Sequence, residues 1–172
     1  MGSGKLTAVT DSGPIIHLTE IGCLSILSIF GNLHVPDAVW VETVEFGRTS
    51  SENLLRLPNL HRHTLPQDIV RQFIENNNLF ELHSGECECL YLSRQINVPL
   101  LLTDDLAVRE TAKRLKLTPI GSLGIVAKAY HLGRISMTDA QSYIIDLYEM
   151  SSLFVTKTIV EMAIEQLQNP KK

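Results

Sequence analysis

Short apolar, β-branched runs alternate with helix-like segments along this sequence. Residues 6–10 form the first strand-like run, and residues 98–103 form the most strand-like run of the chain. A turn with Pro14 in place to open a helix follows the first run, and an amphipathic segment with Leu106 and Val108 on its apolar face follows the second. Strands that alternate with helices in this way are typical of an α/β fold, in which helices flank a mainly parallel sheet.

Hydrophobic periodicity, together with glycine and proline positions, predicts the remaining elements. The predicted strands are residues 6–10, 32–35, 60–65, 98–103 and 117–120, and the predicted helices are Pro14 to about Gly22, 23–30, Pro36 to Gly47, 66–77, 84–95, 106–116, 122–132, 138–149 and 156–168. Residues 48–57 are polar and poorly periodic, and no element is predicted there.

The length and composition favour one compact domain. The chain has 172 residues, of which 44% are hydrophobic, so it can bury one sizeable core. We expect a single domain over residues 6–168, with residues 1–5 as an expression-vector remnant or a disordered start. The net charge of −4 excludes a general field for binding polyanions. No run of about 18 uncharged apolar residues and no signal core occurs, so we expect a soluble, cytoplasmic protein with no membrane contact.

Cysteines and histidines give weaker signals for metal binding. Cys87 and Cys89 lie two apart in a predicted helix and point away from each other, so reduced thiols fit better than a disulfide or a Cys–His metal site. His61 and His63 share one face of the predicted edge strand at 60–65. The sequence places no third ligand beside them, so solvent-facing histidines are the favoured interpretation over metal ligation.

Acidic residues follow directly after the two strongest strands. Asp11 follows residues 6–10, and Asp104 and Asp105 follow residues 98–103. In parallel α/β sheets, ligands bind beyond the carboxyl ends of the strands, which share one edge. Aspartate is also a common helix cap and turn residue, so a structural role stays open for each residue taken alone.

Two glutamates on predicted helices extend this acidic set. Glu42 lies in the helix that starts near Pro36, and Glu86 lies in the first turn of the helix before the strand at 98–103. Taken alone, Glu42 suits a solvated surface and Glu86 suits the positive end of a helix dipole. Several carboxylates near one point repel each other unless a cation holds them, and such hard oxygen ligands suit Mg²⁺ or Mn²⁺.

Four motifs resemble those of prokaryotic PIN-domain proteins, a family that includes the VapC-type toxins. They are VTDSGPIIHL at residues 9–18, VPDAVWVE at 35–42, GECE at 85–88 and LLTDD at 101–105. The stretch from IGSLG at 120–124 through GRIS at 133–136 is similar to a PIN subfamily of mostly unassigned function. The resemblance covers about residues 6–165.

The resemblance implies a PIN-like three-layer α/β/α sandwich whose acidic pocket binds one or two divalent ions and cuts RNA. It implies that four residues are catalytic, namely Asp11, Glu42, Glu86 and Asp104. Glu88 and Asp105 are lower-ranked metal ligands. The family often has aspartate where Glu86 stands, and the doubled aspartate leaves the register at Asp104 uncertain by one residue.

Within such a site the acids divide into direct and indirect roles. We expect Asp11 as the central metal ligand, Asp104 and Glu86 as further ligands, and Glu42 as a water-mediated ligand or proton acceptor. Asp104 is the first residue past its strand, whereas Asp105 is expected to cap the next helix.

Polar and basic residues near the same edge are candidates for holding the substrate. Ser12 and Thr103 could position a water or phosphate, or serve only as turn and cap residues. Four basic residues are candidates for contacts with the phosphates of a nucleic acid: Arg48, Arg109, Lys113 and Arg114. The alternative is that they form a solvated helix face.

The expected partners are an RNA substrate, a cognate antitoxin protein and a second copy of the chain. A homodimer is suggested by the family and by the apolar run at residues 23–30, which could equally be ordinary core. The main rival function is a catalytically inactive PIN-fold binding module. A phosphoryl-accepting receiver domain is disfavoured, because Gly121 and Ser122 stand after a late strand where that class needs a lysine.

Overall fold

A five-stranded parallel sheet forms the centre of the molecule. The structure is a computed structural model that describes residues 5–57 and 60–169, so residues 1–4 of the expected start segment lie outside the described residues. The strand order is β3-β2-β1-β4-β5, and every pairing is parallel. The strands are β1 (Thr7–Thr10), β2 (Asn32–Pro36), β3 (Leu60–His63), β4 (Leu100–Leu102) and β5 (Thr118–Ile120). The predicted α/β class with a parallel sheet is confirmed.

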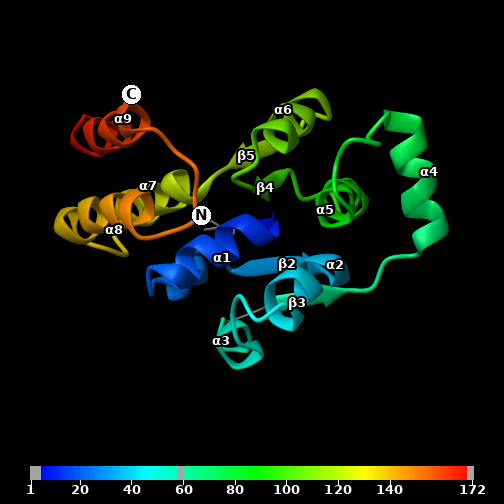
Figure 1. The fold of residues 1–172 in the computed structure, drawn as a ribbon, viewed down its shortest axis with the longest axis horizontal. Coiled ribbons are helices and arrows are strands. Elements are labelled where there is room, and N and C mark those ends of the chain that lie inside the picture. Colours follow the sequence, from blue (N-terminus) through cyan, green and yellow to red (C-terminus); the bar gives the residue numbers. More distant parts are fainter. Residues whose placement is uncertain (1–4, 58–59, 170–172) are drawn as a thin grey trace.

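Helices cover both faces of this sheet. They are α1 (Ser12–Glu20), α2 (Asp37–Trp40), α3 (Ser51–Leu55), α4 (Gln67–Asn77), α5 (Ser84–Gln95), α6 (Leu106–Arg114), α7 (Ser122–His131), α8 (Met137–Glu149) and α9 (Lys157–Gln168). A 3₁₀ helix, η1 (Leu24–Ile29), and a π-helix, η2 (Val41–Glu45), complete the set. Figure 1 shows α4 and α5 on one side of the sheet and α1, α7 and α8 on the other, which is the predicted α/β/α sandwich.

The central strands are buried on both faces, as expected for a parallel sheet. Val9 of β1 pairs with His34 of β2 on one side and Leu101 of β4 on the other. Val9 and Leu101 are fully buried. The backbone N–H of Asp11 donates to the carbonyl of Leu102 at 2.8 Å, so the chain after β1 starts beside the end of β4. This edge carries the carboxyl ends of all five strands.

Three local predictions need correction. The run at residues 23–30 forms the 3₁₀ helix η1 rather than an α-helix. The predicted helix from Pro36 to Gly47 divides into α2 and η2, and the Thr43 hydroxyl donates to the Val39 carbonyl at 2.8 Å at this change. Such bonds from a threonine to the preceding turn bend helices. Residues 48–57, where no element was predicted, contain α3, which Ser50 caps through the backbone N–H of Asn53.

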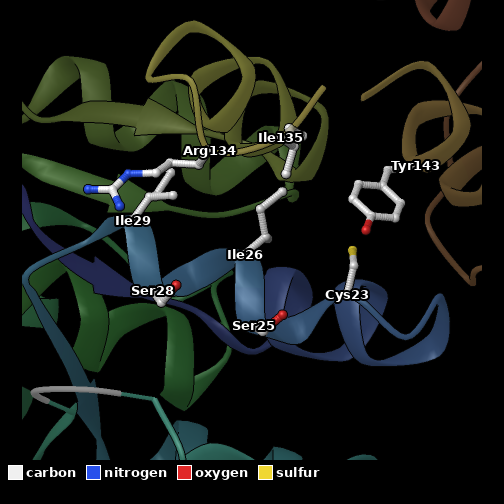
Figure 2. Close-up of a pocket in the computed structure, with 8 residues that line it drawn as sticks. All are labelled: Cys23, Ser25, Ile26, Ser28, Ile29, Arg134, Ile135 and Tyr143. Carbon is white, nitrogen blue, oxygen red and sulfur yellow. The ribbon is translucent and has the colours of Figure 1, made fainter. Parts of the chain in front are cut away.

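The apolar run at residues 23–30 belongs to the core and not to an exposed face. Leu27 and Phe30 are almost fully buried. The outer side of η1 lines a groove, shown in Figure 2, with residues from the segment between α7 and α8 and from α8 itself. The lining residues are Cys23, Ser25, Ile26, Ser28, Ile29, Arg134, Ile135 and Tyr143. The run therefore gives no support to the dimer that it suggested in the sequence.

Two further properties follow from the packing. All three cysteines are buried and free, as the sequence predicted, and burial raises the pKa of the Cys23 thiol to about 12. Across residues 5–57 and 60–169, every helix is too short or too polar to cross a membrane.

Candidate functional site

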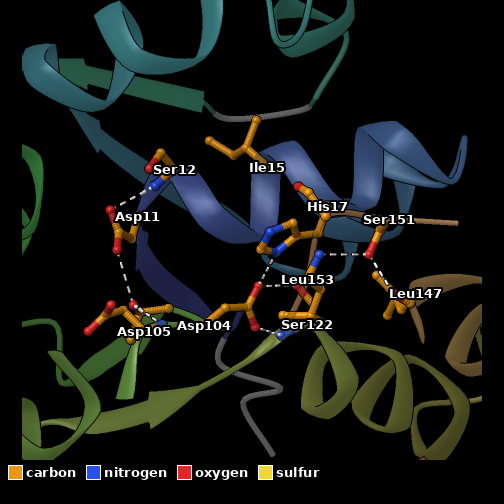
Figure 3. Close-up of polar contacts among 12 residues, drawn as sticks. Asp11, Ser12, Ile15, His17, Asp104, Asp105, Ser122, Leu147, Ser151 and Leu153 are labelled. Carbon is orange, nitrogen blue, oxygen red and sulfur yellow. Dashed lines mark hydrogen bonds and ion pairs between the residues drawn. The ribbon is translucent and has the colours of Figure 1, made fainter. Parts of the chain in front are cut away.

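Asp11 lies at the junction of β1 and α1 with its carboxylate held by two donors. Its Oδ1 accepts a hydrogen bond from the Ser12 backbone N–H at 2.8 Å, and its Oδ2 accepts one from the Thr103 hydroxyl at 3.0 Å. The residue is only 4% exposed, although it stands at the open edge of the sheet. Figure 3 shows the carboxylate of Asp11 beside Ser12 at the start of α1. Asp11 is therefore fixed in orientation and partly desolvated.

Glu42 and Glu86 reach the same region from η2 and α5. A Cβ atom added to Gly85 would lie 2.5 Å from Glu42 Oε1, so the Glu42 carboxylate rests against the first turn of α5. One turn later on α5, Cys89 Sγ is 3.5 Å from the Thr10 carbonyl oxygen at the end of β1. The start of α5 thus lies between Glu42 and the strand that leads to Asp11.

The charges of these three acids act on one another. Burial, together with the charges of Glu86 and Glu42, raises the pKa of Asp11 to about 7 against the hydrogen bonds from Ser12 and Thr103, which lower it. Burial followed by the charges of Asp11 and Glu42 also places the pKa of the Cys89 thiol well above its ordinary value. We call Asp11, Glu42 and Glu86 the acidic cluster, since they share one electrostatic environment.

Asp104 takes a different direction from the three members of the acidic cluster. Its Oδ1 accepts from the Ser122 backbone N–H at 2.6 Å, and its Oδ2 accepts from the Ser122 hydroxyl at 2.5 Å and lies 2.7 Å from His17 Nδ1. Figure 3 shows its side chain pointing toward His17 and Ser122 and away from Asp11. Of the four expected site acids, Asp104 thus joins β4 to α1 and α7. The other three lie close enough for their charges to act on one another.

Asp105 has the capping role that the sequence predicted. Its Oδ1 accepts from the Val108 backbone N–H at 3.0 Å, and it is the N-cap of α6. Its own backbone N–H donates to the Thr103 hydroxyl at 3.3 Å. Since Thr103 also donates to Asp11 and is fully buried, its hydroxyl positions these two acids and is out of reach of a substrate.

The Glu88 carboxylate accepts hydrogen bonds from two neighbouring helices, α2 and α4. Its Oε2 accepts from the Ala38 backbone N–H at 3.1 Å, and its Oε1 accepts from Gln67 Nε2 at 2.8 Å. With 5% exposure, it is buried between the starts of α2 and α4. This corrects its ranking as a metal candidate, because a buried carboxylate between two donors already has its hydrogen bonds satisfied.

Of the basic residues expected to contact phosphate, Arg109 lies nearest to the residues just described. A Cβ added to Gly121, next to Ser122, would be 2.8 Å from Arg109 Nη1. Arg48 instead contacts Glu20 at 3.4 Å, at the end of α1 opposite Asp11. Arg114 donates to the Asn77 carbonyl at 3.3 Å and, like the exposed Lys113, stands in the last turn of α6.

His17 and Ser122 are site residues that the sequence analysis missed. Both act on Asp104, and both come from segments distant from it along the chain. A signal was present for Ser122, since Gly121 and Ser122 follow β5 at the edge where Asp11 and Asp104 stand. The sequence gave no indication that His17 belongs to the site, because a histidine inside a helix can face the core, the solvent or a site equally well.

The acidic cluster has the donor chemistry of a site for Mg²⁺ or Mn²⁺. Within the described residues, the Glu42 carboxylate has no hydrogen bond or ion pair, whereas Glu86 Oε2 accepts from the His83 backbone N–H at 2.8 Å. Each Asp11 oxygen keeps a lone pair beyond the single bond it accepts. No preformed cage of three or more ligands exists in the part of the chain that the structure describes. The residues fit a hard cation by their negative charge and their oxygen donors.

Comparison with known proteins gives one family. A family model described as a PIN domain matches residues 7–169, which is nearly the whole chain. No significant match is found among curated proteins.

Proposed function

Because the chain belongs to the PIN-domain family, whose members are generally nucleases, we propose that it is a divalent-metal-dependent endoribonuclease that hydrolyses RNA phosphodiester bonds. The observation that carries the proposal is the acidic cluster at the carboxyl edge of the sheet. There, the negative charges of Glu86 and Glu42 act on the nearly buried carboxylate of Asp11 and raise its pKa. An arrangement of this kind is electrostatically costly when empty, and a cation relieves the cost.

The acidic cluster would hold Mg²⁺ or Mn²⁺ through Asp11 and Glu86, with Glu42 bound directly or through water. Such an ion supplies a water nucleophile at neutral pH and stabilises charge on the leaving oxygen. Ser12 N–H and the Thr103 hydroxyl fix the orientation of the Asp11 carboxylate. Glu42, whose carboxylate has no partner within the described residues, is the group best placed to accept a proton from the attacking water.

Asp104 and Arg109 act around this centre. In place of the direct ligation expected from the sequence, we assign Asp104 a positioning role, since its carboxylate holds the first turn of α7 and the ring of His17. Arg109, beside Gly121, is the candidate for a phosphate contact, which aligns a nucleic acid without reading its sequence. Ser12 is half-buried at the start of α1 and can reach a phosphate only through its hydroxyl, since its N–H is used by Asp11.

Three parts of the proposal rest on the family resemblance. They are RNA as the substrate, a toxin role with a cognate antitoxin, and a homodimeric state. Expression in a bacterial host tests the toxin role. Growth arrest with the native chain, relieved in Asp11→Asn, supports the toxin proposal, and equal growth of both strains opposes it.

The deciding experiment is cleavage of a pooled RNA library by the purified protein with Mg²⁺, Mn²⁺ or EDTA. We expect metal-dependent cleavage that falls by at least about a hundredfold in Asp11→Asn and Glu42→Gln, since both remove donors from the acidic cluster. Glu45→Gln is the matched control, because Glu45 is an exposed residue of the same π-helix. Absence of cleavage with every metal, together with retained RNA or protein binding, would favour the inactive binding module instead.

A further inference from the structure

Three histidines gather on the outer two strands of the sheet, apart from the acidic cluster. His61 and His63 lie two residues apart on β3, so their side chains share a face. His34 of β2 is the register partner of His61 and stands on the same face. The rings of His34 and His61 are stacked with centroids 4.8 Å apart, and those of His34 and His63 are 5.0 Å apart. The sequence predicted that His61 and His63 share a face, and the structure adds His34 of β2 to them.

The nitrogen atoms of this group are already oriented by hydrogen bonds. His34 Nδ1 lies 2.8 Å from His63 Nε2, so one nitrogen carries a proton and the lone pair of the other points at it. His61 Nε2 lies 3.1 Å from Asn32 Oδ1, an oxygen that can only accept, so this nitrogen is the donor. Its other nitrogen, Nδ1, therefore keeps a free lone pair.

The charge states of His34 and His63 suit metal binding at neutral pH. Burial, together with the charges of His63 and His61, lowers the pKa of His34 to about 4. Burial also lowers the pKa of His63, with the charge of His61 acting in the same direction and that of Asp37 opposing it. Neutral imidazole is the form that binds metal ions.

The positive charge of Arg62 is turned away from this face and paired with Asp37. Arg62 lies between His61 and His63 on β3, so its side chain leaves from the opposite face. Its Nε is 2.5 Å from Asp37 Oδ1, and its guanidinium lies 4.7 Å from the centre of the Trp40 ring. No competing positive charge from this residue reaches the three rings.

We propose that His34, His61 and His63 bind one divalent transition-metal ion of the Zn²⁺ class at the β2–β3 edge. Imidazole nitrogens suit Zn²⁺, Co²⁺, Ni²⁺ and Cu²⁺, whereas Mg²⁺ prefers oxygen. Two nitrogens about 2.0 to 2.1 Å from a tetrahedral ion are roughly 3.3 Å apart. The His34–His63 nitrogen distance of 2.8 Å thus has to open by about half an ångström as the ion replaces the shared proton. His61 then turns Nδ1 toward the ion, since the three rings do not converge on one point without it.

The test is titration of the tag-free, chelator-treated protein with Co²⁺ and Zn²⁺. We expect one tight site per chain, filled before the oxygen ligands of the acidic cluster, because imidazole suits these ions better than carboxylate does. It should be seen as visible absorption of bound Co²⁺ that Zn²⁺ displaces, and as a thermal midpoint that rises with Zn²⁺. His61→Gln and His63→Gln should each weaken Zn²⁺ binding at least about tenfold, because even an outer-shell partner is worth tenfold or more. His131→Gln, at an exposed histidine on α7, and Asp11→Asn are controls that should bind Zn²⁺ as the native chain does.

Three results would overturn the proposal. They are no bound Co²⁺ or Zn²⁺ at micromolar concentration, equal binding by the native chain and both β3 variants, or loss of the site in Asp11→Asn, which would place the ion in the acidic cluster. His61 is exposed, so His61→Gln is expected to stay folded, and a circular dichroism spectrum checks this. None of these results depends on nuclease activity.

Discussion

Asp11 holds a carboxylate in a position where its ionised form is disfavoured. Its pKa of about 7 in the folded chain lies above the ordinary value of 3.8, chiefly because of burial. A raised pKa means that the folded state binds the proton more tightly than the unfolded state. The resulting stability is present below about pH 3.8 and is lost as the pH rises through about 7. In the absence of metal, Asp11 therefore opposes folding at neutral and alkaline pH.

Asp11→Asn should consequently be more stable than the native chain at pH 8, by an amount on the order of a few kcal/mol, and the gap should close toward pH 4. Asparagine keeps an acceptor for the Ser12 N–H and is a good helix cap. Urea unfolding at several pH values in EDTA measures the gap, with Asp68→Asn, an exposed acid on α4, as control. Addition of Mn²⁺ at pH 8 should stabilise the native chain and not the variant. A variant that is less stable at pH 8 contradicts the assignment.

Residue type and position located the acidic cluster, but not the direction of every side chain. The places of Asp11 and Glu86 in the fold were predictable, because Asp11 follows a strand and Glu86 opens a helix at one edge of a parallel sheet. The direction of Asp104 was not, because it depends on the hydroxyl of Ser122 and the ring of His17. Both partners lie far from Asp104 in sequence, and local pattern carries no information about such contacts.

At the scale of elements, two adjacent aspartates anchor two different helices. Asp104 holds the first turn of α7 and contacts α1, while Asp105 caps α6. Asp105→Ala should lower the free energy of unfolding by about 0.5 to 2 kcal/mol, while Asp105→Asn should stay close to the native value. Asp104→Ala should cost more than Asp105→Ala, since it leaves several donors at a part-buried junction without their acceptor. Thermal and urea unfolding of the three variants give the comparison.

Cleavage assays on the same variants separate structure from chemistry. The sequence places Asp104 at the metal site and Asp105 at a helix cap, so Asp104→Asn is expected to abolish cleavage and Asp105→Asn to leave most of it. The structure adds that Asp104→Asn should also be destabilised, because the charged carboxylate that accepts from Ser122 and contacts His17 is lost. A stable but inactive Asp105→Asn would instead show that the charge of Asp105 belongs to the metal site and that the register is shifted by one residue.

The elements themselves were predictable to different degrees, for physical reasons. β4 and α6 followed from strong periodicity, and the break between them followed from the cap at Asp105. The π-helix η2 was not predictable, because it shares the periodicity of an α-helix to within a fraction of a residue per turn. The five-residue helix α3 is shorter than the window over which a hydrophobic face can be recognised.

At the scale of the whole molecule, alternation of strands and helices gave the parallel sheet, but not the order β3-β2-β1-β4-β5. Strand order depends on which distant strands pair, and the pattern of a single strand does not encode its neighbour. The same limit applied to the run at residues 23–30. Its apolar residues predicted burial equally well against the core or against a second copy, and the structure places Leu27 and Phe30 in the core.

A different surface is available for self-association. Large apolar side chains are exposed along α8, α9 and the segment between them, and they include Met150, Phe154, Ile159 and Met162. Phe154 is 96% exposed, which is unusual for a side chain of that size. Ile159 and Met162 lie three residues apart on α9 and so share a face of that helix. Large exposed apolar patches mark interaction sites on proteins.

We predict that the chain self-associates through this surface and that Phe154→Asp shifts it toward the 19.2 kDa monomer. A charge at the centre of an apolar interface has to be desolvated without a partner, so dimer affinity should fall by at least about tenfold. Phe80→Asp is the matched control, because Phe80 is 66% exposed and lies between α4 and α5. Light scattering across micromolar concentrations measures the mass of each protein. A native chain that stays at the monomer mass contradicts self-association, and equal loss in both variants contradicts the choice of surface.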